Sequence, residues 1–516
     1  MNSVCCLKVL KGKYNFKRPY SSFDEVESSG SGFLIEGGKG YVVTAAHVVA
    51  DAISIIGRFI KSGKKDLNLE IVGICREKDL ALLKICSSDL SLLPDPIPLK
   101  FGDSMLIKPG DKVKAIGFPL GTSSVKISEG IVSGFESVED NREDSITRCP
   151  AYIQITAPIN PGNSGGPLLN AENEVIGITV SGKDRSQNIS FAVPSRTFIA
   201  IYKELKKGGK VNMPTLSLDW CKTNREIMKK QTGSASTYGI YVRRIYPDSC
   251  CDILEKGDII RRIDYVDTMW TTNGATNKET FALREVKDKE EVLVTVFLDR
   301  FGMSTNIGRL KNPAEADETK IEFEKIFTDR KMEIPEIMDM IPIGTDIMLN
   351  ICRIAECGPS WYMLKTKYIM TPNYRVPSIY PTLNCRNSKP IDYEIFGGMC
   401  VTNLSLEAMN AFDIERDMSN QFEKRLIIVQ VFPATLAYKT DSVREGMLIK
   451  SVYAYDKDMV LLKETHKHIE SLDTLRDILK LKPDFLQVNC SDDSTFLFSP
   501  SPEEDEYIKK TYKILD

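Results

Sequence analysis

Three short segments of the chain hold residue types that can carry out nucleophilic catalysis. His47 lies in TAAHVV, Asp79 begins DLALLK, and Ser164 lies in NPGNSGGPL. A serine hydroxyl is a weak nucleophile until a base removes its proton. Histidine can be that base near neutral pH, because the unperturbed pKa of imidazole lies near 6.5. A carboxylate would hold the correct imidazole tautomer and stabilise the imidazolium. The three residues therefore predict a Ser-His-Asp triad that performs acyl transfer.

Glycines surround the candidate nucleophile. In acyl transfer, negative charge develops on the carbonyl oxygen, and backbone N–H groups must point at it. Glycine permits the tight backbone shape that this requires. We therefore expect an oxyanion hole at Gly162, Asn163 and Ser164, with the N–H groups of Gly162 and Ser164 as donors and Asn163 between them.

The elements that must position these residues are predicted to be β-strands. Residues 25–208 contain many short apolar runs that are separated by Gly, Pro, Ser and Asn, which is typical of a barrel or sandwich. Ser29–Gly32 is expected to be a flexible lead-in to the first strand, after an N-terminal segment at 1–24. Apolar residues at helical spacing predict a helix at Ser195–Lys207.

The rest of the chain predicts two further folded regions. The first, 225–372, contains a helix-like EIPEIMDMIPIG, a strand-like DIMLNICRI and a solvated acidic insertion at 313–325. A Pro- and Asn-rich linker at 371–390 leads to the second region, 391–498, with a helix near 471–481. The tail, 499–516, is expected to be mobile.

Composition excludes several classes of protein. At roughly 100–200 residues per domain, 516 residues predict three or four domains. With 42% hydrophobic and 27% charged residues, the chain is not globally disordered. Its 68 basic and 71 acidic residues give a formal charge of -3, without the basic excess of a nucleic-acid-binding protein.

Neither a metal nor another cofactor is expected. The 13 cysteines do not form CxxC pairs at zinc-site spacing. They are expected to be reduced, buried thiols of an intracellular protein. His466 and His468 are expected on a solvated surface.

The sequence predicts no membrane span. The most apolar stretch, Tyr41–Gly57, is too short and too polar to cross a bilayer. The first 20 residues lack the apolar core of a secretory signal. We therefore expect a soluble, intracellular protein, with the compartment left open.

Residues 30–196 resemble the trypsin-like serine peptidases of the HtrA (Deg) family. The resemblance rests on GSGFLIE, GYVVTAAHVV, KDLALLKI, AIGFPLG, ISEGIVSG, INPGNSGGPLLN and ISFAVPS, in the family's order. It implies a mainly β fold, a chymotrypsin-like double β-barrel, with the triad in the cleft between two six-stranded barrels. It also implies peptide hydrolysis without ATP or metal.

The two later regions resemble PDZ-like α+β domains. In the first, a loop expected to capture a peptide's terminal carboxylate, while the peptide adds a strand to the sheet, contains Tyr238, Gly239, Ile240 and Tyr241. Pro247–Ser249 and Lys256–Ile260 match further turns of such modules. A plain β-domain without peptide binding is the alternative. The second region, with Phe396–Gly398, resembles the degenerate second PDZ module of plant-type Deg proteases. This resemblance implies that the module serves assembly or occupies its neighbouring module rather than binding substrate.

The resemblance also places a specificity pocket. The segment before the nucleophile, 154–162, contains no Asp or Glu. A pocket for Lys or Arg needs a buried carboxylate, because an unpaired buried cation is costly. Ile159, with Ile178 and Val180 from the following strand, would instead line an apolar S1 slot. We expect cleavage after Val, Ile, Leu or Ala.

Two functions remain at this point. The first is a serine endopeptidase that cleaves unfolded or exposed protein segments, with PDZ-like modules that capture C-terminal peptides or support assembly. The second is a catalytically restrained peptide-binding scaffold. A homo-oligomer, a trimer or a multiple of one, is implied by family resemblance. Aromatic residues that could form a trimer contact, or simply pack on their own domain, are Tyr14, Phe16, Tyr20 and Phe23.

Overall fold

The computed structural model divides the chain into two compact units, and each is described by itself. Unit 1 comprises Met1–Leu10, Glu27–Asp140 and Thr147–Pro372, and unit 2 comprises Lys11–Val26, Asn141–Ile146 and Asn373–Asp516. The structure describes residues 2–21, 24–36, 40–60, 65–93, 97–122, 124–137, 151–180, 189–211, 216, 218–224, 226, 238–245, 254–267, 270–273, 278–281, 292–301, 303–310, 322–325, 331–355, 358–367, 391–414, 424–440, 443–462, 469–512 and 514. His466, His468, Phe23, Pro247–Ser249, the 371–390 linker and most of the acidic insertion lie outside these residues.

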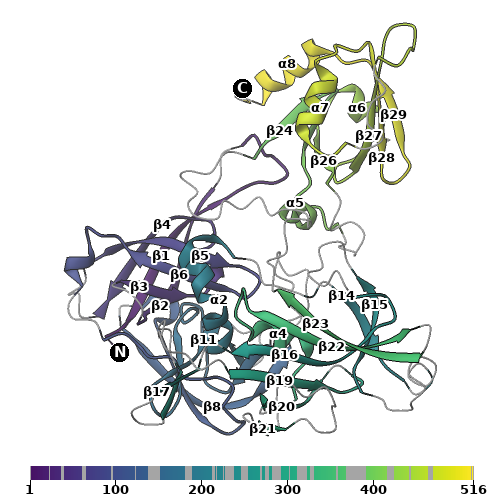
Figure 1. The fold of residues 1–516 in the computed structure, drawn as a ribbon. Helices are drawn as coiled ribbons and strands as arrows, with labels where there is room; N and C mark the ends of the chain where they lie inside the picture. Colours follow the sequence, from purple (N-terminus) through teal and green to yellow (C-terminus); the bar gives the residue numbers. More distant parts are fainter. Residues whose placement is uncertain are drawn as a thin grey trace. The chain divides into compact units, whose positions relative to one another are not determined.

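Unit 1 begins with a closed six-stranded barrel (Figure 1). Around the barrel its strands are β4 (Ala52–Phe59), β1 (Val4–Lys13), β2 (Asp24–Leu34), β3 (Tyr41–Thr44), β6 (Leu80–Ile85) and β5 (Leu67–Cys75), and the pairing of β5 with β6 closes the ring. A short β13 (Gly209–Lys210) runs parallel to β5. Val4 and Leu7 of β1 are fully buried in the barrel core. The predicted domain start at residue 25 is therefore wrong, because β1 supplies part of this core.

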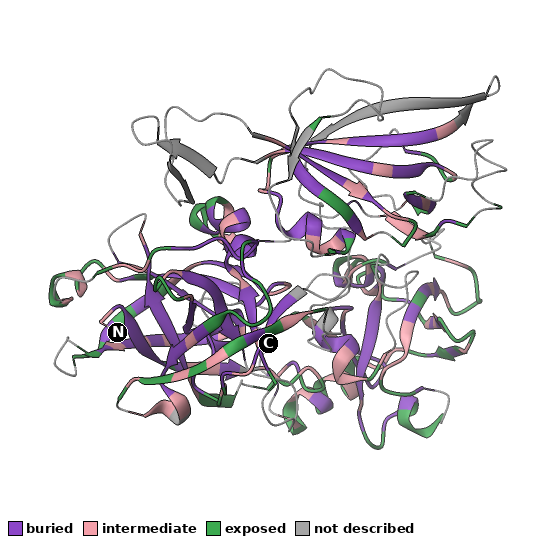
Figure 2. Cartoon of the chain, turned by 90° about the horizontal axis from the view of Figure 1, so that it is seen from below, coloured by how far each residue is buried: buried purple, intermediate pink, exposed green. Residues whose placement is uncertain are grey.

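A second closed barrel follows. Its strands, in order around the ring, are β7 (Lys112–Gly117), β8 (Lys126–Ser137), β9 (Ala151–Ile155), β12 (Ser190–Pro194), β11 (Val175–Val180) and β10 (Pro167–Leu169). Two short 3-10 turns, Leu90–Leu92 and Pro119–Gly121, lie in the connections. Burial, coloured in Figure 2, differs among these strands: β10 and β11 are buried throughout, whereas Val132 is the one buried residue among those of β8 whose burial is described. The predicted mainly β fold with a chymotrypsin-like double barrel is confirmed.

Helix α2 spans Ser195–Lys207, as predicted. Its apolar face buries Phe198, Ile201 and Leu205 in the core around the first barrel. The start of the helix is fixed to the connection between the barrels. The Ser195 hydroxyl donates to the Gly102 carbonyl at 2.7 Å and accepts from the Ser104 N–H at 3.2 Å, and it is fully buried.

The last part of unit 1 is a third sheet. Its strands β14 (Leu218–Lys222), β15 (Ile240–Ile245), β16 (Ile259–Asp267), β19 (Val292–Leu298), β20 (Ser304–Leu310) and β21 (Phe323–Lys325) pair in that order, and β22 (Asp346–Ala355) pairs with β16 and β23 (Gly358–Lys367). A small hairpin joins β17 (Trp270–Asn273) and β18 (Lys278–Phe281). Helix α4 (Ile334–Asp339) covers the sheet through Ile334, Ile337 and Met338, which are buried in its core. The helix and the strand β22 confirm two sequence predictions, whereas the end of the expected acidic insertion forms β21.

Unit 2 contains a six-stranded antiparallel sheet. In order, its strands are β24 (Tyr393–Phe396), β25 (Met399–Asn403), β26 (Leu426–Val431), β27 (Leu448–Tyr455), β28 (Phe485–Cys490) and β29 (Thr495–Phe498), and its helices are α5 (Leu406–Ala411), α6 (Leu436–Lys439), α7 (Leu472–Leu479) and α8 (Pro502–Thr511). Alternate residues of β26 enter two separate cores, one with Leu426 and Ile428 and one with Ile427 and Val429. Both faces of the sheet are therefore covered.

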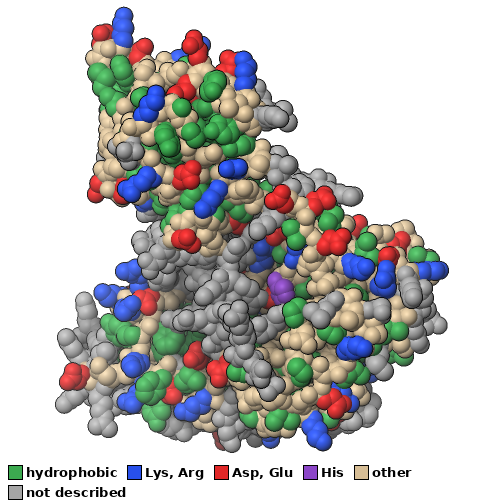
Figure 3. Space-filling model, turned by 180° about the vertical axis from the view of Figure 1, so that it is seen from behind, with side chains coloured by type: hydrophobic (Ala, Val, Ile, Leu, Met, Phe, Trp, Pro, Cys, Tyr) green, Lys and Arg blue, Asp and Glu red, His purple; other side chains and the backbone are tan. Residues whose placement is uncertain are grey.

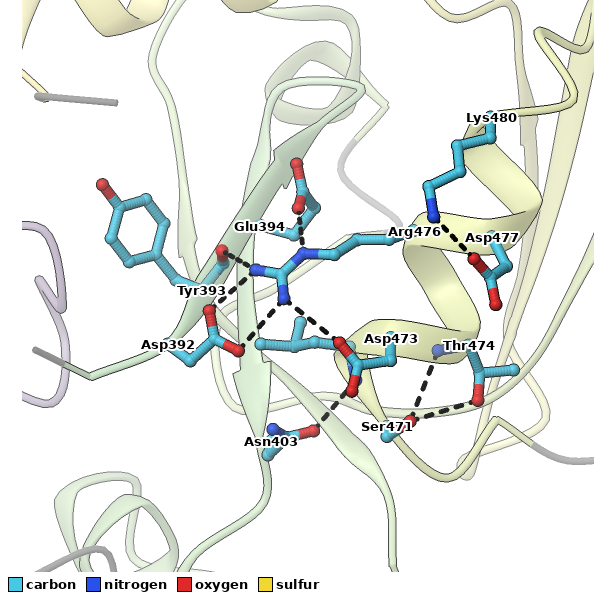
Figure 4. Close-up of polar contacts among 11 residues, drawn as sticks. Asp392, Tyr393, Glu394, Asn403, Ser471, Asp473, Thr474, Arg476, Asp477 and Lys480 are labelled. Carbon is cyan, nitrogen blue, oxygen red and sulfur yellow. Dashed lines mark hydrogen bonds and ion pairs between the residues drawn. The ribbon is translucent and has the colours of Figure 1, made fainter. Parts of the chain in front are cut away.

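Arg476 connects α7 to the first strand of this sheet (Figure 4). It donates to Glu394 at 2.8 Å, to Asp392 at 2.7 Å and to the Tyr393 carbonyl at 2.9 Å. Hydrogen bonds to the two carboxylates raise the pKa of Arg476 above its already high ordinary value. Ser471 caps the same helix by accepting from the Thr474 N–H.

One expectation about the ends of the chain is wrong. The tail is not mobile throughout, because it forms α8, and Ile508 and Ile514 are buried in one core of unit 2. Tyr20 also packs within unit 2, edge-on to Tyr393, and donates to Gln430 at 2.6 Å. It therefore belongs to its own chain's fold. Among the described residues, none of the helices is both long enough and apolar enough to cross a bilayer.

Candidate active site

His47 and Asp79 form a closely held pair. His47 lies in the one-turn helix α1 (Ala46–Val49), directly after β3. Its Nδ1 lies 2.7 Å from Asp79 Oδ2, and its backbone N–H donates to Asp79 Oδ1, also at 2.7 Å. Since both carboxylate oxygens lie at hydrogen-bond distance from His47 donors, the arrangement favours the tautomer with its proton on Nδ1, in which Nε2 is the ring nitrogen that can accept a proton.

The two members of this pair differ in exposure. The Asp79 side chain is 2% exposed, whereas the His47 side chain is 37% exposed. A histidine, coloured purple, is visible on the surface in Figure 3. A buried orienting carboxylate and an accessible imidazole are the arrangement that general-base catalysis requires.

The turn that precedes β6 fixes Asp79. Its backbone is left-handed, with φ +54°, a conformation that Asp tolerates better than most residues. The Asp79 N–H closes the turn on the Arg76 carbonyl at 3.1 Å. Arg76 in turn pairs with Asp51 at 2.7 Å. The carboxylate therefore sits on an anchored turn.

The Ser164 loop lies against the segment that leads to His47. Gly165 has φ +83°, and a Cβ there would approach Thr44 Oγ1 to 2.2 Å, the Ser31 carbonyl to 2.3 Å and the Ala45 nitrogen to 2.8 Å. Only glycine permits this approach. The loop that carries Ser164 is thus packed against the residue that precedes α1.

The loop that holds Gly162, Asn163 and Ser164 was predicted to form an oxyanion hole, and two of these three residues are candidates to donate their backbone N–H groups to it. The Asn163 N–H donates to the Asn160 carbonyl at 2.9 Å, so it is engaged within the loop. The Asn163 carbonyl accepts from Thr179 Oγ1 at 2.8 Å. Asn163 therefore shapes the loop, and the N–H groups of Gly162 and Ser164 remain the candidate donors. Gly162 adopts φ +97°, which again favours glycine.

Ser31 is a structural member of this site that the sequence reading missed. Its Oγ donates to the Gly162 carbonyl at 2.7 Å and accepts from the Phe118 N–H at 2.9 Å. Its own N–H donates to the Ser164 carbonyl at 2.8 Å. Ser31 is fully buried within β2, so Ser29–Gly32 is not a flexible lead-in. The sequence offered little signal for this role, because Ser31 stands in a run of Ser and Gly residues, ESSGSGFL.

The predicted S1 residues do not share one apolar wall. Ile178 is 0% exposed and Val180 is 4% exposed, and both belong to the core around the first barrel. Ile159 is half-buried against the core of the second barrel. Its N–H donates to Ser190 Oγ at 3.1 Å, which makes Ser190 a neighbour that the sequence reading missed. Of the three, only Ile159 retains exposed surface for a substrate.

The residues predicted to bind a peptide, Tyr238–Tyr241, lead into a strand whose two edges are already paired. Ile240 and Tyr241 pair with Ile260 and Ile259 of β16 on one edge of β15, and with Lys222 and Cys221 of β14 on the other. The Gly239 N–H donates to the Leu298 carbonyl, and Tyr238 forms a bridge with Asp299. A peptide cannot add a strand at Tyr238–Tyr241, because both edges are already used. Among the described strands, β14 pairs with β15 alone, so the other edge of β14 is open; β21 and β23 likewise have one partner strand each.

Comparison with known proteins defines the class of the barrels. Residues 30–178 match the trypsin-like peptidase domain family. A probable periplasmic serine endoprotease DegP-like from Pseudomonas fluorescens is 36% identical over 241 residues, 46% of this chain and 47% of that protein. Its counterpart in Rickettsia conorii is 33% identical over 277 residues, 52% of this chain and 51% of that protein. The chain thus matches about half the length of these relatives.

A solved structure, the HtrA-type protease AlgW with tripeptide, is 26% identical to this chain in sequence. The match covers 57% of this chain and 89% of the AlgW chain, with a TM-score of 0.40. The strand pairings, rather than this superposition, define the fold. The chain therefore contains a trypsin-like peptidase domain that is homologous to DegP-like serine endoproteases.

Proposed function

We propose that this protein is a serine endopeptidase that uses Ser164, His47 and Asp79, without ATP. The observation that carries the proposal is the double hydrogen bond of Asp79 to His47. It fixes the imidazole in the tautomer that can accept a proton from serine. The packing of the Ser164 loop against Ala45 supports the third member.

Catalysis would proceed in two acyl-transfer steps. His47 Nε2 takes the Ser164 proton as Oγ attacks the peptide carbonyl, and the imidazolium then protonates the leaving amine. The Gly162 and Ser164 N–H groups would stabilise the oxyanion. Water, activated by the same imidazole, then hydrolyses the acyl-enzyme. Since 154–162 holds no acidic residue, small apolar residues such as Val or Ala are the proposed residues before the cut.

We further propose that the third sheet binds an extended peptide on the open edge of β14 rather than at β15. Main-chain hydrogen bonds to Leu218–Lys222 would provide affinity. Unfolded segments or C-terminal peptides are the proposed ligands. The layout with two PDZ-like modules, plant-type in its order, and assembly into a homo-oligomer are also proposals, supported by the sequence resemblance of regions 225–372 and 391–498.

Labelling with a fluorophosphonate probe tests the endopeptidase proposal. Wild-type protein should label on Ser164 and cleave casein, and Ser164→Ala should do neither while keeping its circular dichroism spectrum. Casein cleavage retained in Ser164→Ala would refute the assignment. Wild-type protein that binds peptides but neither labels nor cleaves would favour the restrained scaffold instead.

A further inference from the structure

Within unit 1, a buried ion pair joins the turn before β6, which holds Asp79, to helix α4, which covers the third sheet. Lys78 Nζ lies 2.6 Å from Asp339 Oδ2, and the two side chains are 8% and 10% exposed. Lys78 directly precedes Asp79 in the turn before β6, and Asp339 is the last residue of α4. The chain therefore pairs Lys78, the residue before the proposed triad aspartate, with a carboxylate from 261 residues further along.

Burial of this pair removes both charged groups from water, which costs free energy unless each group is paired. Burial raises the pKa of Asp339, and the Lys78 ammonium opposes that rise. A buried charge is tolerated when it is paired, and removal of one partner leaves the other uncompensated. The Lys78 ammonium would then be attracted to the carboxylate of the next residue, Asp79, which must remain aimed at His47.

Helix α4 is held firmly enough to act as an anchor. Ile337 is fully buried in the core of the third sheet. Just beyond the helix, the Ile343 N–H donates to the Ala200 carbonyl of α2 at 3.3 Å, and the Ile343 side chain packs on the core around the first barrel. Met105 of the inter-barrel connection is also buried in the core of the third sheet.

The Asp79 turn needs such an anchor. Asp79 has a left-handed backbone conformation, which is strained and persists only when several surrounding contacts hold it in place. Two restraints come from the barrel itself, namely the Asp79–Arg76 turn hydrogen bond and the Arg76–Asp51 ion pair. Asp339 supplies the third, from outside the barrels.

We propose that Lys78 and Asp339 are positioning residues that hold the Asp79 carboxylate against His47, so that the third sheet contributes to the geometry of the triad. This inference rests on the proposed endopeptidase function. Neither residue is assigned a step in the chemistry.

The test compares three variants of the full chain with the wild type. Asp339→Asn removes the negative charge from the pair. Asp264→Asn is the matched control, since Asp264 forms an equally buried ion pair with Arg262 at 2.9 Å that lies entirely within the third sheet. The double variant Lys78→Met/Asp339→Leu replaces the pair with apolar side chains of similar size.

Two readouts are needed: kcat and KM on a fluorogenic peptide with blocked ends, and the low-field proton resonance of His47 Nδ1. Asp339→Asn should lower kcat about 5- to 100-fold, because small displacements of a catalytic group are costly. It should leave KM unchanged and shift the Nδ1 resonance. Asp264→Asn should change neither readout, and the double variant should regain most of the lost kcat.

The proposal is overturned if Asp339→Asn keeps wild-type kcat and the wild-type Nδ1 resonance. Equal losses in Asp339→Asn and Asp264→Asn would also overturn it, since destabilisation of the sheet would then explain both. If the wild type shows no Ser164-dependent cleavage, the proposed function fails. The Nδ1 resonance would still decide whether Asp339 positions the Asp79–His47 pair.

Discussion

Ser31→Ala is expected to lower turnover through the proposed oxyanion loop, in addition to its effect on stability. The substitution removes an Oγ that donates to the Gly162 carbonyl and accepts from the Phe118 N–H. Both partners are left without this bond in a buried setting, which costs about 1–3 kcal/mol each when no replacement forms. The Gly162 carbonyl belongs to the loop that presents the oxyanion donors, so the loop loses one of its fixed points.

The size of the expected loss in kcat can be estimated from the loss that follows removal of one oxyanion-hole donor. Removal of a donor costs about 10²- to 10³-fold in kcat. Ser31→Ala displaces the Gly162 N–H without deleting it, so we expect a loss of about 10- to 100-fold, with KM little changed. The rate of fluorophosphonate labelling of Ser164 should fall in parallel.

Ser195→Ala is the matched control for this prediction. The Ser195 hydroxyl is equally buried and also makes one donated and one accepted backbone hydrogen bond, but away from the oxyanion loop. Chemical denaturation should show similar losses of stability in the two variants. The reasoning is refuted if both variants keep wild-type kcat, or if Ser195→Ala loses as much as Ser31→Ala.

Three further changes test other parts of the structure. Asp79→Asn should lower kcat by about 10⁴-fold in the same peptide assay, because its amide would face His47 Nδ1 and favour the wrong tautomer; a loss below tenfold would contradict the triad. Gly165→Ala should destabilise the fold by more than about 2 kcal/mol and abolish labelling, since its Cβ would meet the Ser31 carbonyl at φ +83°; urea denaturation would expose the error if stability were unchanged. Burial raises the pKa of Asp505 from 3.8 to about 6, so the folded state binds its proton more tightly than the unfolded state does. The stability of unit 2 should therefore fall as the pH rises from about 4 through about 6, by about 1–2 kcal/mol. Calorimetry of the full chain should show that Asp505→Asn lacks this decrease, and an identical pH dependence in both proteins would argue against Asp505 as its source.

The features that were predicted correctly from the sequence depend on residues close together in the chain. His47, Asp79 and Ser164 stand in local motifs whose chemistry is legible from residue type, and α2 follows from apolar spacing within one segment. The structure added what distant pairing determines. For example, β14 pairs with one edge of β15. The residues between these two strands have no sequence pattern that predicts this pairing.

Tertiary contacts explain the other misses. Nothing near Lys78 in the sequence points to Asp339, and a strand pattern at Val4–Lys13 does not reveal which barrel will accept it. Two of the residues expected in the S1 pocket are buried for a related reason. Ile178 and Val180 lie in β11, whose residues are all buried, and they join the core that the first barrel and α2 form.

The contact of Tyr20 has a consequence for how the chain is made. Its partner Gln430 is 410 residues further along. At a synthesis rate of about 5–20 residues per second, Tyr20 and its neighbours at 14–21 wait roughly 20–80 s before Gln430 is made. During that interval β1 can already pair in the first barrel, while residues 14–21 have no surface to bind. A nascent chain stopped before residue 391 should therefore be cut by an added protease within 14–21, and the full chain should resist at the same position.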